Sequence, residues 1–556
     1  MTAATQTQRI CIIGGGAAGI GLAWSLARAT ELGLNAASYD ITVVHDQDSI
    51  GGHSWTQPGV KVGNRTVNVD CGVQAIAPKW YPVTMSMLDL DEFAGVGVTP
   101  LEMKIACVFP DGGTADFKYW GNFGSYLDTP LAAGARNDCQ VFQDLLAAKL
   151  SLGWGLSLAE TVDKLIEDNA DKFTNGDPTH FVTYFLDGYM SILNGYGNAL
   201  LDELIVGDLA ALWDLGYADF LAPIEDYGRF EQGAMEWVKR MWTLTVDKLG
   251  QSNVTLRTST RVVELWPDTG SGPTIVTEPT EGGAPSAPES FDIVVSTVDM
   301  RGNANMLENV NNPLWESVFE PAIGTPSVDN YYATSVWKLN PGFCTLHQDA
   351  SFVADTPREE VMQFNTLPGR KGDGTGFDLA NSYTTYIVSN LNGIREVDPA
   401  DDWYVTMFGF VPDEDKRPKK SLWSSPWTHG MFLPTFYTEE KLRFHRAQGT
   451  SVHHKAHHHQ ADTGIYFAGN NLTMDAEEGA LISGLAVAKY AFGIDPIPLI
   501  TPASGRNATV DKAEAMFDVF YDGLMFPGLL EEALGEVGGL VAWFLKHWIP
   551  VITPPG

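Results

Sequence analysis

Apolar residues near the N-terminus fall into two short runs separated by about 27 positions. Residues 10–13 form a continuous apolar run with three isoleucines, and residues 41–44 form a second run rich in β-branched side chains. Runs of this length are typical of strands buried on both faces. The pattern predicts a strand–helix–strand unit of a parallel α/β sheet, with the helix over residues 17 to about 29.

Glycines follow the first predicted strand in the order G-x-G-x-x-G, at Gly14, Gly16 and Gly19. Gly14 allows a tight turn, Gly16 lets the backbone approach a pyrophosphate, and Gly19 lets the helix pack closely on the strand. The helix would direct its free N–H groups, including that of Ala18, toward the phosphates. Glycine-rich turns also occur in other α/β proteins, but the spacing of the whole unit favours dinucleotide binding.

A second glycine pair separates FAD from NAD as the expected dinucleotide. Gly51, Gly52, His53 and Ser54 follow the second predicted strand after six intervening residues. The strand itself ends at His45 and Asp46, where an acidic residue is expected to bind the ribose hydroxyls. Three interpretations remain: a neutral His45 makes one of those hydrogen bonds, Asp46 turns inward and makes both, or neither residue touches ribose.

These motifs, in this order, resemble the flavoprotein superfamily of amine oxidases, protoporphyrinogen oxidase and phytoene desaturases. The Gly-Gly-His-Ser variant is most similar to a subgroup of predicted NAD/FAD-binding proteins and polyunsaturated fatty-acid double-bond isomerases, and residues 67–74 are similar to its strand entering the substrate domain. The resemblance implies FAD as cofactor. It also implies that residues 51–54 lie against the pyrophosphate and ribityl chain.

Two later segments resemble the middle and closing FAD motifs of the same superfamily. Residues 253–257, 260–265 and 291–297 read as strands, and the strand carrying Val262 would hydrogen-bond adenine through its backbone. Residues 267–288, rich in Gly, Pro and Ser, predict an exposed hairpin loop. The closing motif has a strand ending at Gly469, with Asn470 in place of the usual acid. The helix amides that would face the flavin pyrimidine ring belong to Gly479, Ala480 and Leu481.

The resulting fold class is α/β, a discontinuous Rossmann-like FAD-binding domain of the glutathione-reductase type with an inserted α+β substrate domain. Residues 1–77, 228–299 and 452–497 are expected to form the first domain, and residues 78–227 and 300–451 the second. Many aromatic residues in the inserted segments favour an apolar cavity. A helical tail, 498–556, would pack on the body or, alternatively, make a peripheral membrane contact.

Support for an amine substrate is weak in this sequence. In amine oxidases a strand over the flavin carries a lysine. By resemblance Tyr332 takes its place, with Lys338 near the far end of that strand. The aromatic-cage tyrosine of amine oxidases corresponds to Ala476. The expected chemistry is hydride transfer from a small apolar, lipid-like substrate to flavin N5, although no residue can be named as catalytic acid or base.

Three hypotheses for function remain open. They are a net oxidase or dehydrogenase, a redox-neutral double-bond isomerase of polyunsaturated fatty acids, and a non-catalytic flavin-fold binding protein. Five histidines within 453–459 could bind a metal, but a solvated loop is the preferred interpretation, so no metal site is predicted.

Charge and cysteine content narrow the class further. The formal net charge is −34, with the acids dispersed, which disfavours a nucleic-acid partner. Five cysteines without C-x-x-C spacing fit a reducing compartment and no metal cluster. No secretory segment or long apolar run is visible, so a soluble or peripheral cytoplasmic protein is expected. The oligomeric state is open.

Overall fold

The predicted strand–helix–strand unit is present at the N-terminus of the computed structural model. Strand β1 (Thr7–Ile13) leads into helix α1 (Ala17–Glu31), and strand β2 (Ser38–Val44) returns parallel to β1, with Ile10 opposite Ile41. The structure describes residues 7–35, 37–101, 104–109, 117–121, 135–151, 160–182, 186, 227–268, 270–309, 311–319, 337–353, 362–366, 369–370, 377–378, 383–408, 411–432, 448–449, 463–469 and 476–520.

Five parallel strands form the central sheet. Their order is β21-β13-β1-β2-β9, and the three strands not yet named are β9 (Val254–Arg257), β13 (Ile293–Ser296) and β21 (Ile465–Phe467). Segments far apart in the sequence therefore meet in one sheet. The chain leaves β1 toward β2 on one side, while β13 lies on the other side. The strand order thus reverses between β1 and β13, and ligands of open α/β sheets bind at such a point.

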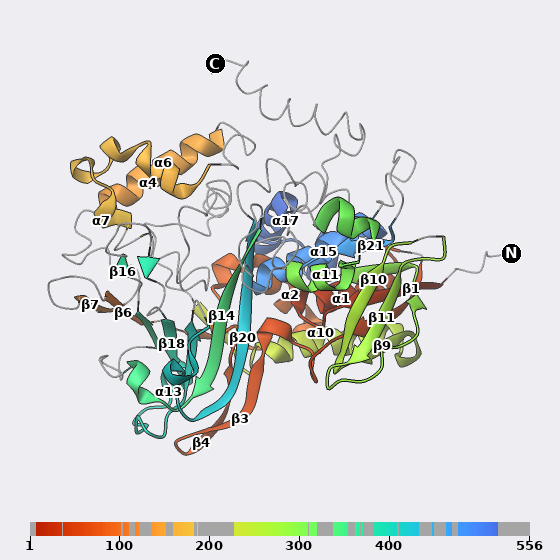
Figure 1. Ribbon diagram of the computed structural model, residues 1–556, viewed down its shortest axis with the longest axis horizontal. Helices are drawn as coiled ribbons and strands as arrows, with labels where there is room; N and C mark the ends of the chain where they lie inside the picture. The colour runs from red at the N-terminus through yellow and green to blue at the C-terminus, as the bar shows by residue number, and fades with distance from the viewer. Residues whose placement is uncertain are drawn as a thin grey trace, which may run out of the picture.

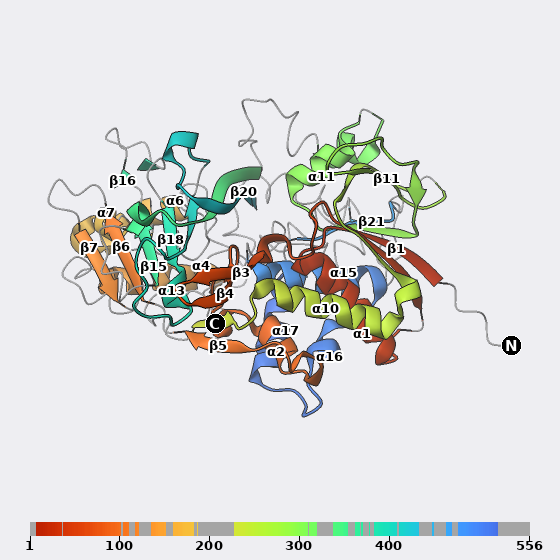
Figure 2. The same ribbon diagram turned by 90° about the horizontal axis from the view of Figure 1, so that it is seen from below.

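The two faces of this sheet are covered differently. Helices α1, α10 (Ala234–Leu249) and α15 (Glu477–Phe492) lie on one face, and strands β10 to β12 with helix α11 (Met300–Leu307) lie on the other (Figure 2). These three strands are β10 (Thr260–Trp266), β11 (Thr274–Pro279) and β12 (Glu289–Ser290). This arrangement agrees with the predicted α/β fold class.

One expectation within this layer is wrong. The segment 267–288 was expected to be an exposed hairpin loop, but it contains β11, in which Ile275 is fully buried. Antiparallel pairing with β10 satisfies the backbone of β11, and its apolar side chains pack under the sheet. Glycine and proline on both sides of this short strand hid its run of three buried residues, 275–277.

A second, mixed sheet of seven strands forms the other part of the molecule. Its longest pair, β14 (Trp337–His347) and β20 (Ser421–Phe432), runs antiparallel alongside the hairpin of strands β3 (Thr56–Val62) and β4 (Arg65–Asp70) (Figure 1). The sheet order is β20-β14-β19-β18-β15-β6-β7, with β6 (Ile105–Phe109), β7 (Phe117–Gly121), β15 (Gln363–Thr366), β18 (Tyr383–Ile387) and β19 (Tyr404–Phe408). Smaller pairs are β3 (Thr56–Val62) with β4 (Arg65–Asp70), β5 (Val98–Leu101) with β8 (Tyr227–Phe230), and β16 (Gly369–Arg370) with β17 (Phe377–Asp378).

The remaining helices pack around both sheets. They are α2 (Pro82–Leu88), α4 (Ala135–Ser151), α6 (Val162–Glu167), α7 (Thr179–Phe181), α13 (Val388–Leu391), α16 (Pro496–Ile500) and α17 (Ala508–Phe520). Side chains of α2 and α11 join the core of the parallel sheet, although both helices come from ranges expected in the substrate domain.

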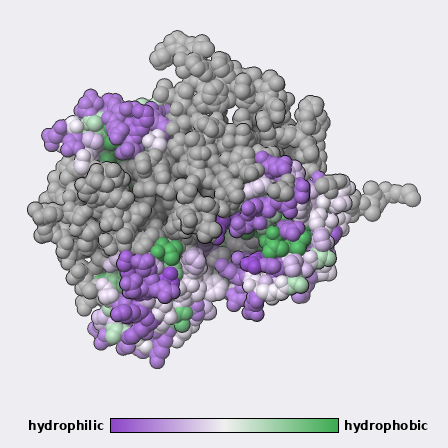
Figure 3. Space-filling view, viewed as in Figure 1, coloured by the Kyte–Doolittle hydropathy of each residue, from purple (hydrophilic) through white to green (hydrophobic). Residues whose placement is uncertain are grey.

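The described part of the tail packs on the body. Met516 and Phe517 of α17 are buried in the main core, next to α15 and α2. Residues 521–556, the histidines at 453–459, Tyr332 and Asn470 lie outside the described residues. No helix among the described residues is long and apolar enough to cross a membrane. On the face shown in Figure 3, the described residues are mostly hydrophilic, with small apolar patches.

Candidate cofactor-binding site

A cavity of about 730 Å³ lies at the carboxyl ends of the parallel strands, where the strand order reverses. Its walls include the loops after β1, β2 and β13, the start of α15, and strands β10, β18 and β19. This volume falls within the roughly 300–1,000 Å³ that is usual for small-molecule and cofactor sites. Twelve of the sixteen residues predicted to contact the cofactor line it: Gly14, Gly16, Ala18, His45, Asp46, Gly51, Gly52, His53, Ser54, Val262, Gly469 and Ala480.

The first glycine loop has the geometry that its sequence predicts. Gly14 has a φ of +111°, and a Cβ atom there would lie 2.4 Å from Thr297 Oγ1. Gly19 does not line the cavity, and a Cβ atom there would lie 2.1 Å from the carbonyl oxygen of Gly14. Gly16 differs, because a Cβ atom there would meet nothing closer than 3.9 Å. The space beside Gly16 is therefore open to a ligand.

Gly16 also ends the loop as the N-cap of α1, without any capping side chain. The first backbone bond of the helix runs from Ile20 N–H to Gly16 C=O, and the first turn carries no acidic residue. The amides of Ala17 and Ala18 are thus available at the positive end of the helix dipole. Such a helix start binds phosphate oxygens.

The second glycine pair packs directly against the first loop. Gly51 N–H donates to Gly15 C=O at 2.9 Å, and Gly51 pairs with Gly16 in a short parallel bridge. Gly51 and Gly52 have φ values of +145° and +58°, and a Cβ atom on Gly52 would lie 3.2 Å from Gly16 Cα. A side chain on Gly52 would push the two loops apart, and one on Gly51 would meet Met235, so the pair shapes the wall on which a pyrophosphate would rest.

His45 is buried, and both of its ring nitrogens are engaged within the protein. Nδ1 accepts a hydrogen bond from Gly15 N–H at 3.2 Å, and Nε2 lies 3.1 Å from the carbonyl oxygen of Ser49. These contacts require a neutral ring with its proton on Nε2, and burial lowers the pKa of His45 accordingly. With both nitrogens engaged, His45 supports the glycine loop and has no free atom for ribose.

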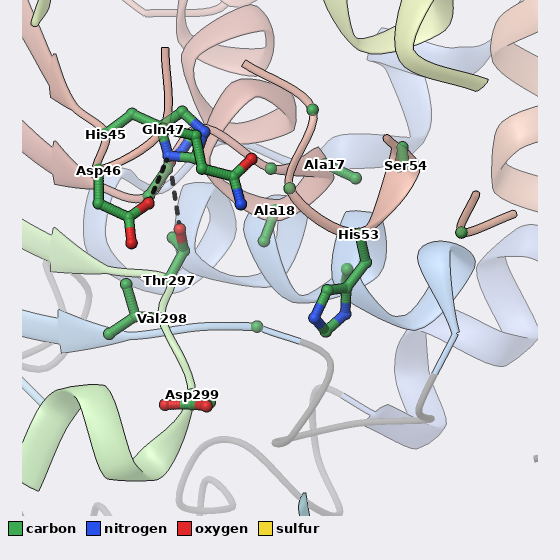
Figure 4. A pocket seen from close by; sticks show the side chains of 18 of the residues that line it. Ala17, Ala18, His45, Asp46, Gln47, His53, Ser54, Thr297, Val298 and Asp299 are labelled. Carbon is green, nitrogen blue, oxygen red and sulfur yellow. Dashed lines mark hydrogen bonds and ion pairs between the residues drawn. The ribbon is translucent and has the colours of Figure 1, made fainter. Parts of the chain in front are cut away.

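Of the two candidate ribose-binding residues, Asp46 has the side chain that is available to a ligand. Its side chain is 64% exposed, and with Gln47 it lines one end of the cavity beside β10 residues 260–263 (Figure 4). A carboxylate there can accept both ribose hydroxyl hydrogen bonds. Figure 4 shows His45, Asp46 and Gln47 on one side of the glycine loop and His53 and Ser54 on the other. The adenosine half of FAD would occupy the Asp46 side, and the flavin half the Ser54 side.

The ends of β13 and β21 complete the floor of the cavity. Thr297 Oγ1 donates to the carbonyl oxygen of Ile13 at 2.9 Å, which joins the ends of β13 and β1. Asp299 caps α11 by accepting from Gly302 N–H at 2.6 Å. Gly469 N–H donates to Ser483 Oγ at 2.8 Å, and a Cβ atom on Gly469 would lie 3.3 Å from the carbonyl oxygen of Thr297. This close approach of two backbones leaves little room for a side chain at residue 469, which explains the glycine there.

Helix α15 reaches the cavity through residues 476, 477 and 480. Gly479 and Leu481, also predicted contacts, do not line it, and the Leu481 side chain packs against Gly21 of α1. Ser54 Oγ donates to Glu477 Oε1 at 2.7 Å, which links the second glycine pair to the helix start. The sequence analysis did not assign Glu477 to the cofactor site, although two adjacent acids, Glu477 and Glu478, stand at the start of the predicted closing helix.

The flavin end is lined by neutral side chains that the sequence analysis did not assign to a ligand. Thr384 and Tyr386 of β18 share one face of the strand, while Thr385 and Ile387 on the other face are fully buried. The alternation in residues 383–387 could have located them. Met407, Tyr81 and Gln74 complete this end, and Gln74 Nε2 donates to Met407 Sδ at 3.6 Å.

The described residues fit FAD in shape and in chemistry. The open space beside Gly16 and the free amides of α1 suit the pyrophosphate, Asp46 suits the ribose, and the apolar end suits the flat flavin ring. The residues able to hold the cofactor come from four loops that only the fold brings together.

Comparison with solved structures gives distant likenesses. A putrescine oxidase bound to putrescine is 12% identical and covers 86% of this chain and 98% of its own, with a TM-score of 0.49. A putrescine oxidase triple mutant is 13% identical, covers 86% and 98%, and has a TM-score of 0.47. An oxidoreductase from Methanosarcina mazei is 11% identical, covers 86% and 100%, and has a TM-score of 0.49. None of these likenesses bears on the substrate of this chain.

Comparison of the sequence with protein-family models identifies the family of this chain. No curated protein matches the sequence. The model of the family described as flavin containing amine oxidoreductase matches residues 18–491, from the second residue of α1 to the last residue but one of α15. The chain therefore belongs to the flavin-containing amine oxidoreductase family and is an FAD-dependent oxidoreductase.

Proposed function

We propose that the protein oxidises a small apolar substrate by moving a hydride from a substrate carbon to N5 of FAD. The observation that carries this proposal is the lining of the flavin end of the cavity. Val73, Tyr81, Tyr386 and Met407 line it with apolar and aromatic surface. Such a lining binds an apolar molecule by removing both surfaces from water.

An amine substrate has little support from the described side chains at this end. Ala476, which stands where the family resemblance places a cage tyrosine, is the extended N-cap of α15 and offers only a methyl group. Glu477 lines the cavity as a buried acid whose pKa burial raises to about 8, so it is a poor ionic partner for a protonated amine at neutral pH.

The contribution of the protein would be to position the substrate and exclude water. Bound FAD supplies the hydride acceptor. Strand β18 is held between β15 and β19, so Thr384 and Tyr386 stand on a fixed backbone at the cavity wall. Thr385 and Thr406 behind them are fully buried and hydrogen-bonded to each other at 2.8 Å. A rigid wall of this kind orients a substrate carbon.

Anaerobic mixing of the purified holoprotein with candidate substrates tests the proposal. Unsaturated fatty acids and other lipids should bleach the flavin absorbance band, whereas simple primary amines should leave it unchanged. Rapid bleaching by primary amines, with no response to any apolar compound, would overturn the apolar assignment.

Redox-neutral isomerisation of a polyunsaturated fatty acid is the second candidate, supported by the resemblance of residues 51–54. Hydride abstraction next to a double bond leaves a delocalised cation, and return of the hydride to another carbon gives a conjugated product. That outcome would show product without oxygen consumption and with retained substrate deuterium. Stoichiometric hydrogen peroxide, or a need for an electron acceptor, would decide for net oxidation. We place net oxidation first because the family consists of oxidoreductases.

A further inference from the structure

Two adjacent acids at the start of α15 have different surroundings. Glu478 is fully buried, and its carboxylate accepts three hydrogen bonds from α2: Val83 N–H at 2.5 Å, Thr84 N–H at 3.0 Å and Thr84 Oγ–H at 2.6 Å. It does not line the cavity. Its role is to tie the start of α2 to α15, since helix starts carry unpaired N–H groups.

Glu477 has only one such contact. Ser54 Oγ–H donates to Oε1 at 2.7 Å, while Oε2 is buried without a hydrogen-bond partner among the described residues. The residue is 8% exposed and forms part of the cavity wall. An ionised carboxylate with one unpaired oxygen is costly in such a buried place, and none of the described residues forms a salt bridge with Glu477.

The charged groups around Glu477 also disfavour ionisation. Asp70 of β4 and Glu478 of its own helix are acids that raise its pKa further, in addition to burial, which is the largest cause. The free N–H groups of the first turn of α15 act in the opposite direction. Other titratable groups that line the same cavity include His53, Tyr81, Asp299 and Tyr386.

We propose that Glu477 is an FAD-binding residue that must carry its proton for tight binding, with Ser54 as the residue that positions it. A bound cofactor displaces the water that remains in the cavity and adds two phosphate charges, and both effects oppose a carboxylate in the wall. Binding and protonation are therefore linked: FAD favours the protonated acid, and the protonated acid favours FAD.

Release of FAD from the holoprotein tests this linkage. The fluorescence of released FAD is followed after dilution into buffers from about pH 6 to about pH 9.5, and the dissociation constant is obtained at each pH. In the wild type the affinity should be constant below about pH 7 and should fall by about tenfold at high pH, since one linked proton changes binding by at most tenfold per pH unit.

Three variants separate the proton of Glu477 from other effects. Glu477→Gln keeps a neutral group of the same shape, so its affinity should match the low-pH wild type within about twofold and lose the alkaline fall. Glu477→Leu should also be independent of pH. Glu478→Gln is the matched control: burial raises the pKa of Glu478 to about 7 as well, but this acid lies outside the cavity, so the variant should lower stability while keeping the alkaline fall.

A spectroscopic measurement does not depend on FAD release. Infrared difference spectra of the holoprotein at neutral pH should contain the C=O band of a protonated carboxylic acid that disappears in Glu477→Gln. A wild-type affinity that does not change with pH, or an alkaline fall that persists in Glu477→Gln, would overturn the proposal. These outcomes are independent of which substrate reduces the flavin.

Discussion

His45 Nδ1 accepts a hydrogen bond from the backbone N–H of Gly15 at 3.2 Å, so a buried imidazole holds the glycine loop in place. The same ring is fixed on its other side by the carbonyl oxygen of Ser49. A histidine at the end of β2, where an acid is usual, is therefore explained by support of the loop rather than by contact with ribose.

Replacing this imidazole should loosen the loop. His45→Phe leaves the Gly15 N–H and the Ser49 carbonyl group without partners, at an expected cost of about 1–3 kcal/mol in the free energy of unfolding. Chemical denaturation of both proteins at pH 7.5 measures the difference. Equal stability of the two proteins would show that the hydrogen bonds contribute nothing.

The difference in unfolding free energy between the wild type and His45→Phe should depend on pH. Burial lowers the pKa of His45 in the folded protein, so the unfolded chain binds more protons below about pH 6.5. The stability due to the neutral ring is present above that pH and is lost as the pH falls. The gap between wild type and His45→Phe should therefore narrow from pH 7.5 to pH 5. A gap that widens would contradict a neutral ring.

Asp46 should affect the cofactor and not the fold. Its exposed side chain lines the adenosine end, so Asp46→Ala should weaken FAD binding by about 5–100-fold, the range of one or two hydrogen bonds to a charged group. The unfolding midpoint of the apoprotein should stay within the small change usual for a surface substitution. Unchanged FAD affinity would instead favour the interpretation that neither residue touches ribose.

The two glycines of the first loop should differ when substituted. Gly16→Val places a side chain in the open space beside Gly52, so the protein should fold and lose FAD. Gly19→Ala places a Cβ atom 2.1 Å from the Gly14 carbonyl oxygen, so it should lower stability by several kcal/mol through overpacking. Circular dichroism and flavin absorbance distinguish the outcomes. A yellow, fully loaded Gly16→Val protein would show that the pyrophosphate binds elsewhere.

Asp70 caps a helix from a distant part of the sequence. Its Oδ1 accepts from Thr56 Oγ–H at 2.5 Å and from Ala234 N–H at 2.8 Å, at the start of α10, whose own N-cap is Gly233. Asp70→Ala leaves both donors unpaired and should cost about 1–3 kcal/mol. Asp70→Asn retains the acceptor oxygen and is the matched control.

The Asn variant should also change the pH profile of stability. Burial raises the pKa of Asp70 to about 6, above its value in the unfolded chain, so this acid contributes most below about pH 4. Its contribution is lost as the pH rises through 6. Relative to the wild type, Asp70→Asn should therefore gain about 2–3 kcal/mol between pH 4 and pH 7.5, by denaturation at both values. No relative gain would indicate that Asp70 ionises normally.

Local sequence determined the elements that carry their own signal. The apolar runs at 10–13 and 41–44 and the glycine spacing define β1, α1 and β2, since buried parallel strands need continuous apolar residues and the turn needs glycine. The family and the cofactor follow from the same motifs, because each interacts with a fixed chemical part of FAD.

Only the tertiary structure determined the surroundings of side chains whose neighbours lie far away in the sequence. Whether His45 or Asp46 is free for ribose depends on the positions of Gly15 and Ser49, and the difference between Glu477 and Glu478 depends on which acid meets α2. Ser54 and Glu477 are 423 residues apart in the sequence and 2.7 Å apart in the fold. Burial and hydrogen bonding set the protonation of such groups, and neither can be deduced from residue type alone.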